Sequence, residues 1–311
     1  MTLYYLYKDN QFEHTCAAAG QGIVETFAKA GCVNLTESEF VSMKNEIKSD
    51  DTIIVYISLK NEECHKKLQS VNCKKILHSM DESKSDQILF RTQMEFCTRH
   101  GVKTMINTFP SQRNIEFLTK AGISTITMPF SGWHRKVNYE NKKVDVLVSG
   151  QIDESYYPIR CKIFSALRNS NIKYYYLPHS GMESSRTIHQ FYGQRFFDLL
   201  DVCWTGVTCR AGAFRDRLVP KYVEFGFSKV LPIGDCPSYM HEDMSSSMIS
   251  INENDDPDKI VFLIKEAISD KQKLIQRIEK YSSHVYQNYD MKKNVDRTIS
   301  MILNNQFDTI A

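Results

Sequence analysis

Asp216 and Glu224 are two carboxylates eight positions apart, with basic residues between them. On an unbroken α-helix eight positions are a little over two turns, so both side chains would project from roughly one face. Pro220 favours a helix that begins at Lys221 instead, with Asp216 in the loop before it. In both geometries the carboxylates can accept hydrogen bonds from sugar or ribose hydroxyls, while Arg217 and Lys221 offset phosphate charge. Spacing alone favours an ordinary solvated surface with ion pairs. The choice between such a surface and a ligand site therefore depends on the strands and helices around the two carboxylates.

Short β-rich segments alternate with helical ones along the whole chain. The first set covers residues 3–7, 52–57, 75–78, 102–106 and 123–128, and the second covers 144–148, 172–177, 202–205, 230–233 and 248–251. A polar stretch at 130–143 interrupts the alternation and is interpreted as a linker. The pattern predicts an α/β protein with two parallel sheets wrapped by helices.

Pro158 indicates the first position of a helix in the second half. Ile159, Ile163 and Leu167 follow it at helical spacing. Arg160 then falls in the first helical turn, beside the loop after a strand. Ligands of such sheets bind beyond the carboxyl ends of the strands, where helix N-termini favour phosphate. This context predicts an anion site at Arg160 and reverses the preference for a plain surface around Glu224.

Composition excludes several classes of protein. The chain has 311 residues, with 39 basic and 37 acidic side chains and a net charge of +2. This balance gives no general field for nucleic acid or anionic lipid. No stretch approaches the length of an apolar membrane span, and the first residues lack the features of a signal peptide. Nine scattered cysteines without a Cys-x-x-Cys pair suit reduced thiols. We therefore expect a cytoplasmic protein with no membrane span.

Five segments in chain order carry a family resemblance: 127–132, 145–151, 157–160, 221–224 and 286–298. The chain resembles GT-B glycosyltransferases of the group 1 superfamily, particularly short members with a spore-maturation-type C-terminal domain. The resemblance covers roughly residues 125 to 305. It implies two Rossmann-like domains that face each other across a cleft. The N-terminal acceptor-side domain would span 1–135 and the nucleotide-sugar-binding domain 136–285, with a helical segment at 286–311 packing back on the N-terminal domain.

The resemblance also implies roles for individual residues of the second domain. Glu224 matches the second glutamate of the family's Glu-x7-Glu signature, which holds the donor ribose. Asp216 takes the first position with a shorter carboxylate and would act catalytically on the sugar, while Arg217 and Lys221 would line the diphosphate. Lys229 stands where the family commonly has glycine, so a turn that needs positive φ would be strained there.

Further candidates come from loops that follow predicted strands. Gly150 and Arg160 belong to the matching segments and are expected to bind the donor, as is His179. A solvent-facing turn is an equal alternative for His179. His78 and His14, in the first domain, are the candidate catalytic groups on the acceptor side, and ordinary loop histidines are the alternative for both.

The implied activity is transfer of a hexose or pentose from a nucleotide diphosphate sugar to a glycan or other hydroxyl acceptor, with retention of configuration. No metal or other cofactor is expected. The one Asp-x-Asp sequence, at 256–258, is interpreted as a helix cap. A nonenzymatic protein that binds a nucleotide sugar or glycan is the alternative. A nicotinamide oxidoreductase fits poorly, because Gly20 and Gly22 lie far from the first strand and Glu25 replaces the third glycine.

Overall fold

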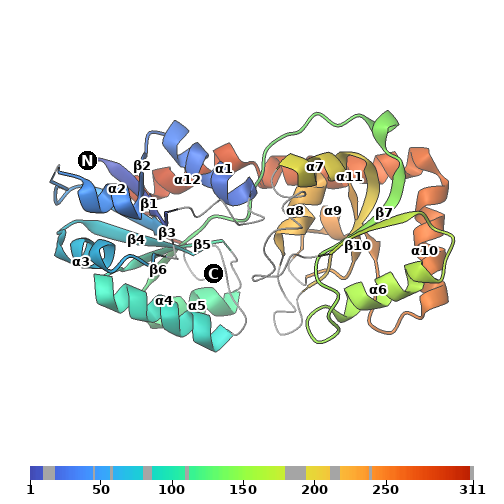
Figure 1. The fold of residues 1–311 in the computed structure, drawn as a ribbon, viewed down its shortest axis with the longest axis horizontal. Coiled ribbons are helices and arrows are strands. Elements are labelled where there is room, and N and C mark those ends of the chain that lie inside the picture. Colours follow the sequence, from blue (N-terminus) through green and yellow to red (C-terminus); the bar gives the residue numbers. More distant parts are fainter. Residues whose placement is uncertain are drawn as a thin grey trace. The chain divides into compact units, whose positions relative to one another are not determined.

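The computed structural model describes residues 1–9, 18–44, 46–56, 59–79, 86–108, 112–178, 194–210, 218–237 and 240–308. The chain divides into two compact units (Figure 1). Unit 1 consists of Met1–Ser131 together with Met291–Ala311, and unit 2 is the continuous segment Gly132–Asp290. Each unit is an α/β body with its own parallel sheet.

Unit 1 contains a six-stranded sheet with the order β2-β1-β3-β4-β5-β6. Its strands are β1 (Leu3–Tyr7), β2 (Val33–Thr36), β3 (Thr52–Tyr56), β4 (Lys74–Ser79), β5 (Thr104–Asn107) and β6 (Ser124–Thr127). All neighbouring pairs are parallel. Every residue of β3 and β5 is buried, as expected for central strands that have helices on both faces.

The helices of unit 1 are α1 (Ala18–Lys29), α2 (Glu37–Ser42), α3 (Glu62–Ser70), α4 (Asp86–His100), α5 (Gln112–Lys120) and α12 (Met291–Leu303). The last of these lies beside α1 and also contacts β6 (Figure 1). Asn294 donates a hydrogen bond to the Ser131 hydroxyl at 2.7 Å, in a buried position. Lys74 of β4 donates to the Ile302 carbonyl at 3.3 Å. These bonds fix the last helix to the unit formed by the first 131 residues.

Unit 2 contains a five-stranded parallel sheet with the order β11-β10-β9-β7-β8. Its strands are β7 (Val144–Ser149), β8 (Tyr174–Leu177), β9 (Cys203–Val207), β10 (Leu231–Gly234) and β11 (Ile249–Ser250). Its helices are α6 (Pro158–Arg168), α7 (Gln194–Asp201), α8 (Pro220–Phe227), α9 (Glu242–Ser245), α10 (Pro257–Ser269) and α11 (Lys271–Asn288). The strand order reverses direction between β7 and β9. In open α/β sheets this reversal marks the usual ligand position.

The predicted α/β fold with two parallel sheets is confirmed. Each predicted strand is present, the first with the predicted ends and the others with shifted ends. The predicted helix at Pro158 is also confirmed, with Ile159, Ile163 and Leu167 on its buried face. Asp256 caps α10 by accepting a hydrogen bond from the Lys259 backbone at 2.8 Å, which confirms the interpretation of that sequence as a cap. The sequence pattern missed β2, a short strand with an exposed first residue.

Lys229 has a φ of 53°, so the turn after α8 has a positive φ at a residue other than glycine. The turn is closed by a hydrogen bond from the Val230 amide to the Phe225 carbonyl at 2.9 Å, as in a Schellman motif. The Lys229 ammonium is ion-paired with Glu279 and lies 4.8 Å from the centre of the Tyr286 ring. These contacts offset part of the strain of a left-handed lysine.

Among the described residues, no helix combines the length and the apolar character needed to cross a membrane.

Candidate functional site

The carboxyl ends of β7, β9 and β10 meet the first turns of α6 and α8 at one edge of the unit 2 sheet. Parallel strands end at the same edge, and the helix that follows a strand begins there. Both helices have proline at the first turn, and neither N-cap side chain, Tyr157 or Val219, caps its helix by a hydrogen bond. Helix N-termini of this kind present backbone N–H groups and a positive dipole end to anions.

Gly150 brings two cationic side chains together. It follows β7 and has a φ of 107°, a conformation that favours glycine. A Cβ atom at this position would lie 2.8 Å from Arg160 Nη1 and 2.8 Å from Lys221 Nζ. The absent side chain therefore leaves the space in which both cations approach the same piece of backbone. Three of the predicted donor-binding residues thus form one cluster.

Arg160 is only 4% exposed although it carries a full charge. Its Nη1 donates to the Gln151 carbonyl at 3.0 Å, and the guanidinium lies 4.0 Å from the centre of the Tyr157 ring. Within the described parts of the chain, its Nε has no hydrogen-bond partner and no carboxylate pairs with it. A buried guanidinium without a counter-charge is costly, and an anionic ligand would reduce that cost.

Two hydroxyls near these cations, like Arg160 Nε, are buried and lack a hydrogen-bond partner among the described residues. Ser149, the last residue of β7, and Thr208, the first residue after β9, each have a buried hydroxyl oxygen with no partner among the described residues. The Ser149 carbonyl accepts a hydrogen bond from Lys221. A buried polar atom without a partner costs about 1–3 kcal/mol, and a bound polar ligand is one way to recover it. Buried polar atoms without a partner therefore lie at the ends of β7 and β9, where the strand order reverses.

Glu224 lies one turn after Lys221 on α8. Burial raises the pKa of its carboxyl to about 7, and the charge of Lys221 opposes this shift. Near neutral pH the group is thus divided between the carboxylate and the neutral acid. Both forms can bond to a hydroxyl group, and the carboxylate can accept two hydrogen bonds from neighbouring hydroxyls.

A second set of contacts holds the ends of β9 and β10 together. A Cβ atom on Gly234 would lie 1.7 Å from the Thr208 carbonyl oxygen, so only glycine permits this approach. Arg210 donates to the Asp235 carboxylate from its backbone N at 2.9 Å and from its Nε at 2.7 Å. Tyr222 donates from its hydroxyl to the Asp235 carbonyl. Sequence reasoning found the strand that ends at Gly234 but missed this clamp, because its partners are separated in the chain.

His78 lies in β4 of unit 1 and is completely buried. Its Nδ1 is 2.7 Å from the Tyr5 hydroxyl, and its Nε2 is 3.4 Å from the Thr108 hydroxyl. The rings of Tyr5, Phe27 and Tyr56 surround it edge-on. Burial lowers the pKa of the imidazole to about 3, so it is neutral at physiological pH. A catalytic role for His78 stays a prediction, and the described contacts are those of a neutral hydrogen-bonding residue.

The remaining predicted site residues, His14, His179, Asp216 and Arg217, lie outside the residues that the structure describes. Their roles stay predictions. Gly20 and Gly22, which begin like a dinucleotide-binding fingerprint, fall within helix α1 and not in a strand-to-helix turn. This placement agrees with the rejection of a nicotinamide site there.

The fold of this chain is similar to that of several solved structures. No family model matches the sequence, and no curated protein matches it. The HepE protein of Anabaena in complex with UDP-glucose is similar in structure, with a TM-score of 0.64 and 9% identity over 97% of this chain and 99% of that one. An alpha-glucosyltransferase in complex with UDP-glucose and DNA containing an abasic site has a TM-score of 0.65 and 11% identity, over 96% and 98% of the two chains.

The fold is GT-B. An α,α-trehalose-phosphate synthase (UDP-forming) from Burkholderia vietnamiensis shares it with a TM-score of 0.54 and 10% identity, over 92% of this chain and 78% of that one. At these identities the similarity establishes the GT-B fold, while the chemistry must be argued from the residues of this chain.

Proposed function

We propose that this GT-B chain is a glycosyltransferase that moves a sugar from a nucleotide diphosphate sugar to a hydroxyl acceptor. The observation that carries the proposal is the convergence of Arg160 and Lys221 on Gly150 beside the start of α8. Two fixed cations and a helix N-terminus suit a diphosphate. Similar structures contain UDP-glucose, which supports a nucleotide sugar as the ligand.

Each part of the donor has a proposed partner. Arg160 and Lys221 bind the diphosphate beside the N-terminus of α8. Glu224, one turn further along the helix, accepts hydrogen bonds from the ribose hydroxyls, which favours its ionised form. On the basis of the family resemblance, Arg217 is proposed as an additional donor contact and Asp216 as the group that contacts the transferred sugar. His179 is proposed as a further donor contact because it follows a predicted strand.

The proposed reaction breaks the bond between the anomeric carbon and the leaving diphosphate oxygen, and forms a bond from that carbon to the acceptor oxygen. The leaving diphosphate oxygen takes the electron pair of the broken bond and then accepts the proton of the acceptor hydroxyl. Negative charge therefore grows on the leaving group in the transition state, where Arg160 and Lys221 stabilise it. We propose that these two cations perform this task without a metal ion.

Several finer features are proposed on the resemblance alone. These are retention at the anomeric carbon, a hexose or pentose as the sugar, a glycan or glycoconjugate as the acceptor and a C-terminal domain of the spore-maturation type. A cytoplasmic location is proposed from the composition of the chain. His14 follows β1 in the sequence, and we propose it for the acceptor side. His78 is proposed to contribute to catalysis as a neutral imidazole, through its neighbours Tyr5 and Thr108.

A thermal-shift screen with UDP-glucose and other nucleotide sugars tests the proposal, because a true donor raises the melting temperature by mass action. Lys221→Ala should lose the shift. Lys162→Ala is the matched control, since Lys162 is also a half-buried lysine of unit 2 that donates to a backbone carbonyl. A Lys221→Ala protein that binds the donor like the wild type would refute the site.

Release of the nucleoside diphosphate separates an enzyme from a binding protein. A glycosyltransferase should release it slowly by hydrolysis of the donor and faster with an acceptor. If the protein binds the donor but releases no nucleoside diphosphate with any acceptor, only the nonenzymatic binding protein remains.

A further inference from the structure

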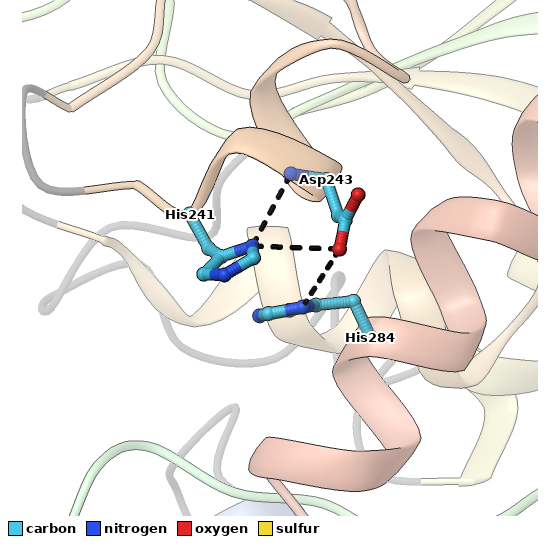
Figure 2. A group of neighbouring side chains, drawn as sticks. All are labelled: His241, Asp243 and His284. Atoms are coloured by element: carbon cyan, nitrogen blue, oxygen red, sulfur yellow. Dashed lines mark hydrogen bonds and ion pairs between the residues drawn. The ribbon is translucent and has the colours of Figure 1, made fainter.

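A cluster of three metal-ligating side chains lies in unit 2 and includes none of the residues proposed to bind the donor. His241 is the N-cap of helix α9, Asp243 lies in its first turn, and His284 comes from helix α11. Figure 2 shows the two imidazole rings one above the other, with both directed at the Asp243 carboxylate. Their ligand atoms all lie within 4.8 Å of one another.

The geometry centres on one carboxylate oxygen. Asp243 Oδ2 is 3.7 Å from His241 Nδ1 and 3.9 Å from His284 Nδ1. Ligands placed about 2.0–2.1 Å from a tetrahedral zinc ion are about 3.3 Å apart. The two separations from the carboxylate oxygen exceed this value by about half an ångström, and all three ligand atoms lie within 4.8 Å of one another, so metal binding requires rotations of the side chains. The ring centroids of the two histidines are 4.2 Å apart, so both rings already share one side of the carboxylate.

The other atoms of these groups have partners suited to an outer coordination shell. Lys280 Nζ is 3.3 Å from Asp243 Oδ1, the oxygen that does not face the imidazoles, and 3.2 Å from the Ser246 hydroxyl. The side-chain amide of Asn288 is 3.3 Å from His284 Nε2. The same amide nitrogen donates to the His284 carbonyl at 2.9 Å, and a metal ion at Nδ1 needs the His284 tautomer that carries its proton on Nε2.

One existing hydrogen bond would be exchanged for the metal ion. The His241 Nδ1 accepts the N-cap hydrogen bond from the Asp243 backbone N at 3.2 Å, and a metal ion at this nitrogen would take the place of that bond.

We propose that His241, Asp243 and His284 bind a divalent first-row transition metal ion, with zinc as the representative ion. Two imidazole nitrogens and one carboxylate oxygen form a ligand set typical of zinc and its neighbours, whereas magnesium and calcium prefer oxygen ligands only. The ion fastens α9 to α11, with its fourth position open to solvent. Lys280, whose side chain is 53% exposed, stays on the outer oxygen of the carboxylate.

Zinc binding by isothermal titration calorimetry to chelator-treated full-length protein tests the proposal. The expected result is that His241→Ala and Asp243→Ala each bind one zinc ion fewer per chain than the wild type, or bind it at least about tenfold more weakly. His134→Ala is the matched control, because His134 is also a half-exposed histidine of unit 2 paired with an aspartate, Asp290. Its zinc binding should equal that of the wild type.

Thermal unfolding gives a second readout that does not depend on nucleotide sugars. Saturating zinc should raise the Tm of the wild type and of His134→Ala by at least about 2 °C, and should leave His241→Ala unchanged. Because His241 and Asp243 are about half exposed, their replacement should preserve the fold. Equal zinc binding by His241→Ala and the wild type, or wild-type binding at millimolar zinc only, would overturn the proposal. Neither result would affect the proposed transfer site.

Discussion

Lys221 opposes the rise in the pKa of Glu224 that burial causes. The two residues lie one turn apart on α8, so the ammonium proposed to hold the diphosphate also keeps the carboxyl proposed to hold the ribose close to ionisation. Charge at one end of the donor site is therefore linked to protonation at the other. This link makes the site testable by pH as well as by mutation.

Donor affinity should increase as the pH rises through about 7, because Glu224 must lose its proton to accept two hydroxyl hydrogen bonds. Donor binding measured by calorimetry from pH 5.5 to 8.5 checks this expectation. Glu224→Gln should bind more weakly and without this pH dependence. A variant that keeps the wild-type pH dependence would show that another group is responsible.

The stability of the folded protein should decrease as the pH rises through the range in which donor affinity increases, and the Glu224 carboxyl should cause both effects. The pKa of Glu224 is about 7 in the folded state and near 4.5 in the unfolded state, so the folded protein binds more protons between these values. Unfolding free energy therefore falls as pH rises through this window, by the order of 1 kcal/mol for each unit of pKa difference. Urea denaturation of the wild type and Glu224→Gln at several pH values should show this slope only in the wild type.

Gly150→Ala should abolish donor binding, since its Cβ would displace both Arg160 and Lys221. The left-handed backbone adds a cost of about 1 kcal/mol to the folded state. Gly101→Ala isolates that second effect, because Gly101 has a φ of 65° and no atom within 4 Å of its Cβ position. If both variants lose stability equally and both still bind the donor, the cluster at Gly150 is not the donor site.

Two substitutions of Lys229 can separate the effect of backbone strain on stability from the effect of the ion pair. Lys229→Ala and Lys229→Gly both remove the ion pair with Glu279, but only glycine is relaxed at a φ of 53°. The glycine variant should therefore be more stable than the alanine variant by about 1 kcal/mol. Chemical denaturation of the two variants side by side gives this difference, and equal midpoints would contradict the strain.

His78 should make the protein sensitive to acid. Its folded-state pKa is about 3 against an ordinary value of 6.5, so the unfolded chain binds the proton first. The contribution of the neutral imidazole to stability is complete above about 6.5 and is lost as the pH falls toward 3. His78→Gln should show a weaker loss of stability in this range, measured by urea denaturation. An equal acid sensitivity would assign the effect to other groups.

The fold was largely predictable from the sequence, because strands of the sheet interior are continuous apolar runs. All five residues of β3 are buried, and its sequence shows this directly. Strand β2 escaped detection because it is four residues long, lies at the edge of the sheet and exposes Val33. An edge strand is stabilised by one neighbour and needs little apolar sequence of its own.

The site was only partly predictable. Arg160 was found from a local signal, a proline that starts a helix after a strand, and the structure places it where that signal indicates. The approach of Lys221 to Gly150 required the order of β7 and β9 in the sheet, which no local pattern gives. The pairing of His241 with His284 likewise depends on the packing of α9 against α11.

The position of α12 has a consequence for biosynthesis. Unit 2 is one uninterrupted segment whose ends are hydrogen-bonded to each other, from the Gly132 amide to the Tyr289 carbonyl at 3.0 Å. Unit 1 is complete only when the residues from Met291 onward have been made. On the ribosome, unit 2 can therefore finish folding before unit 1, although most of unit 1 is translated first. The sheet of unit 1 is covered by α12 only after the end of the chain has been made.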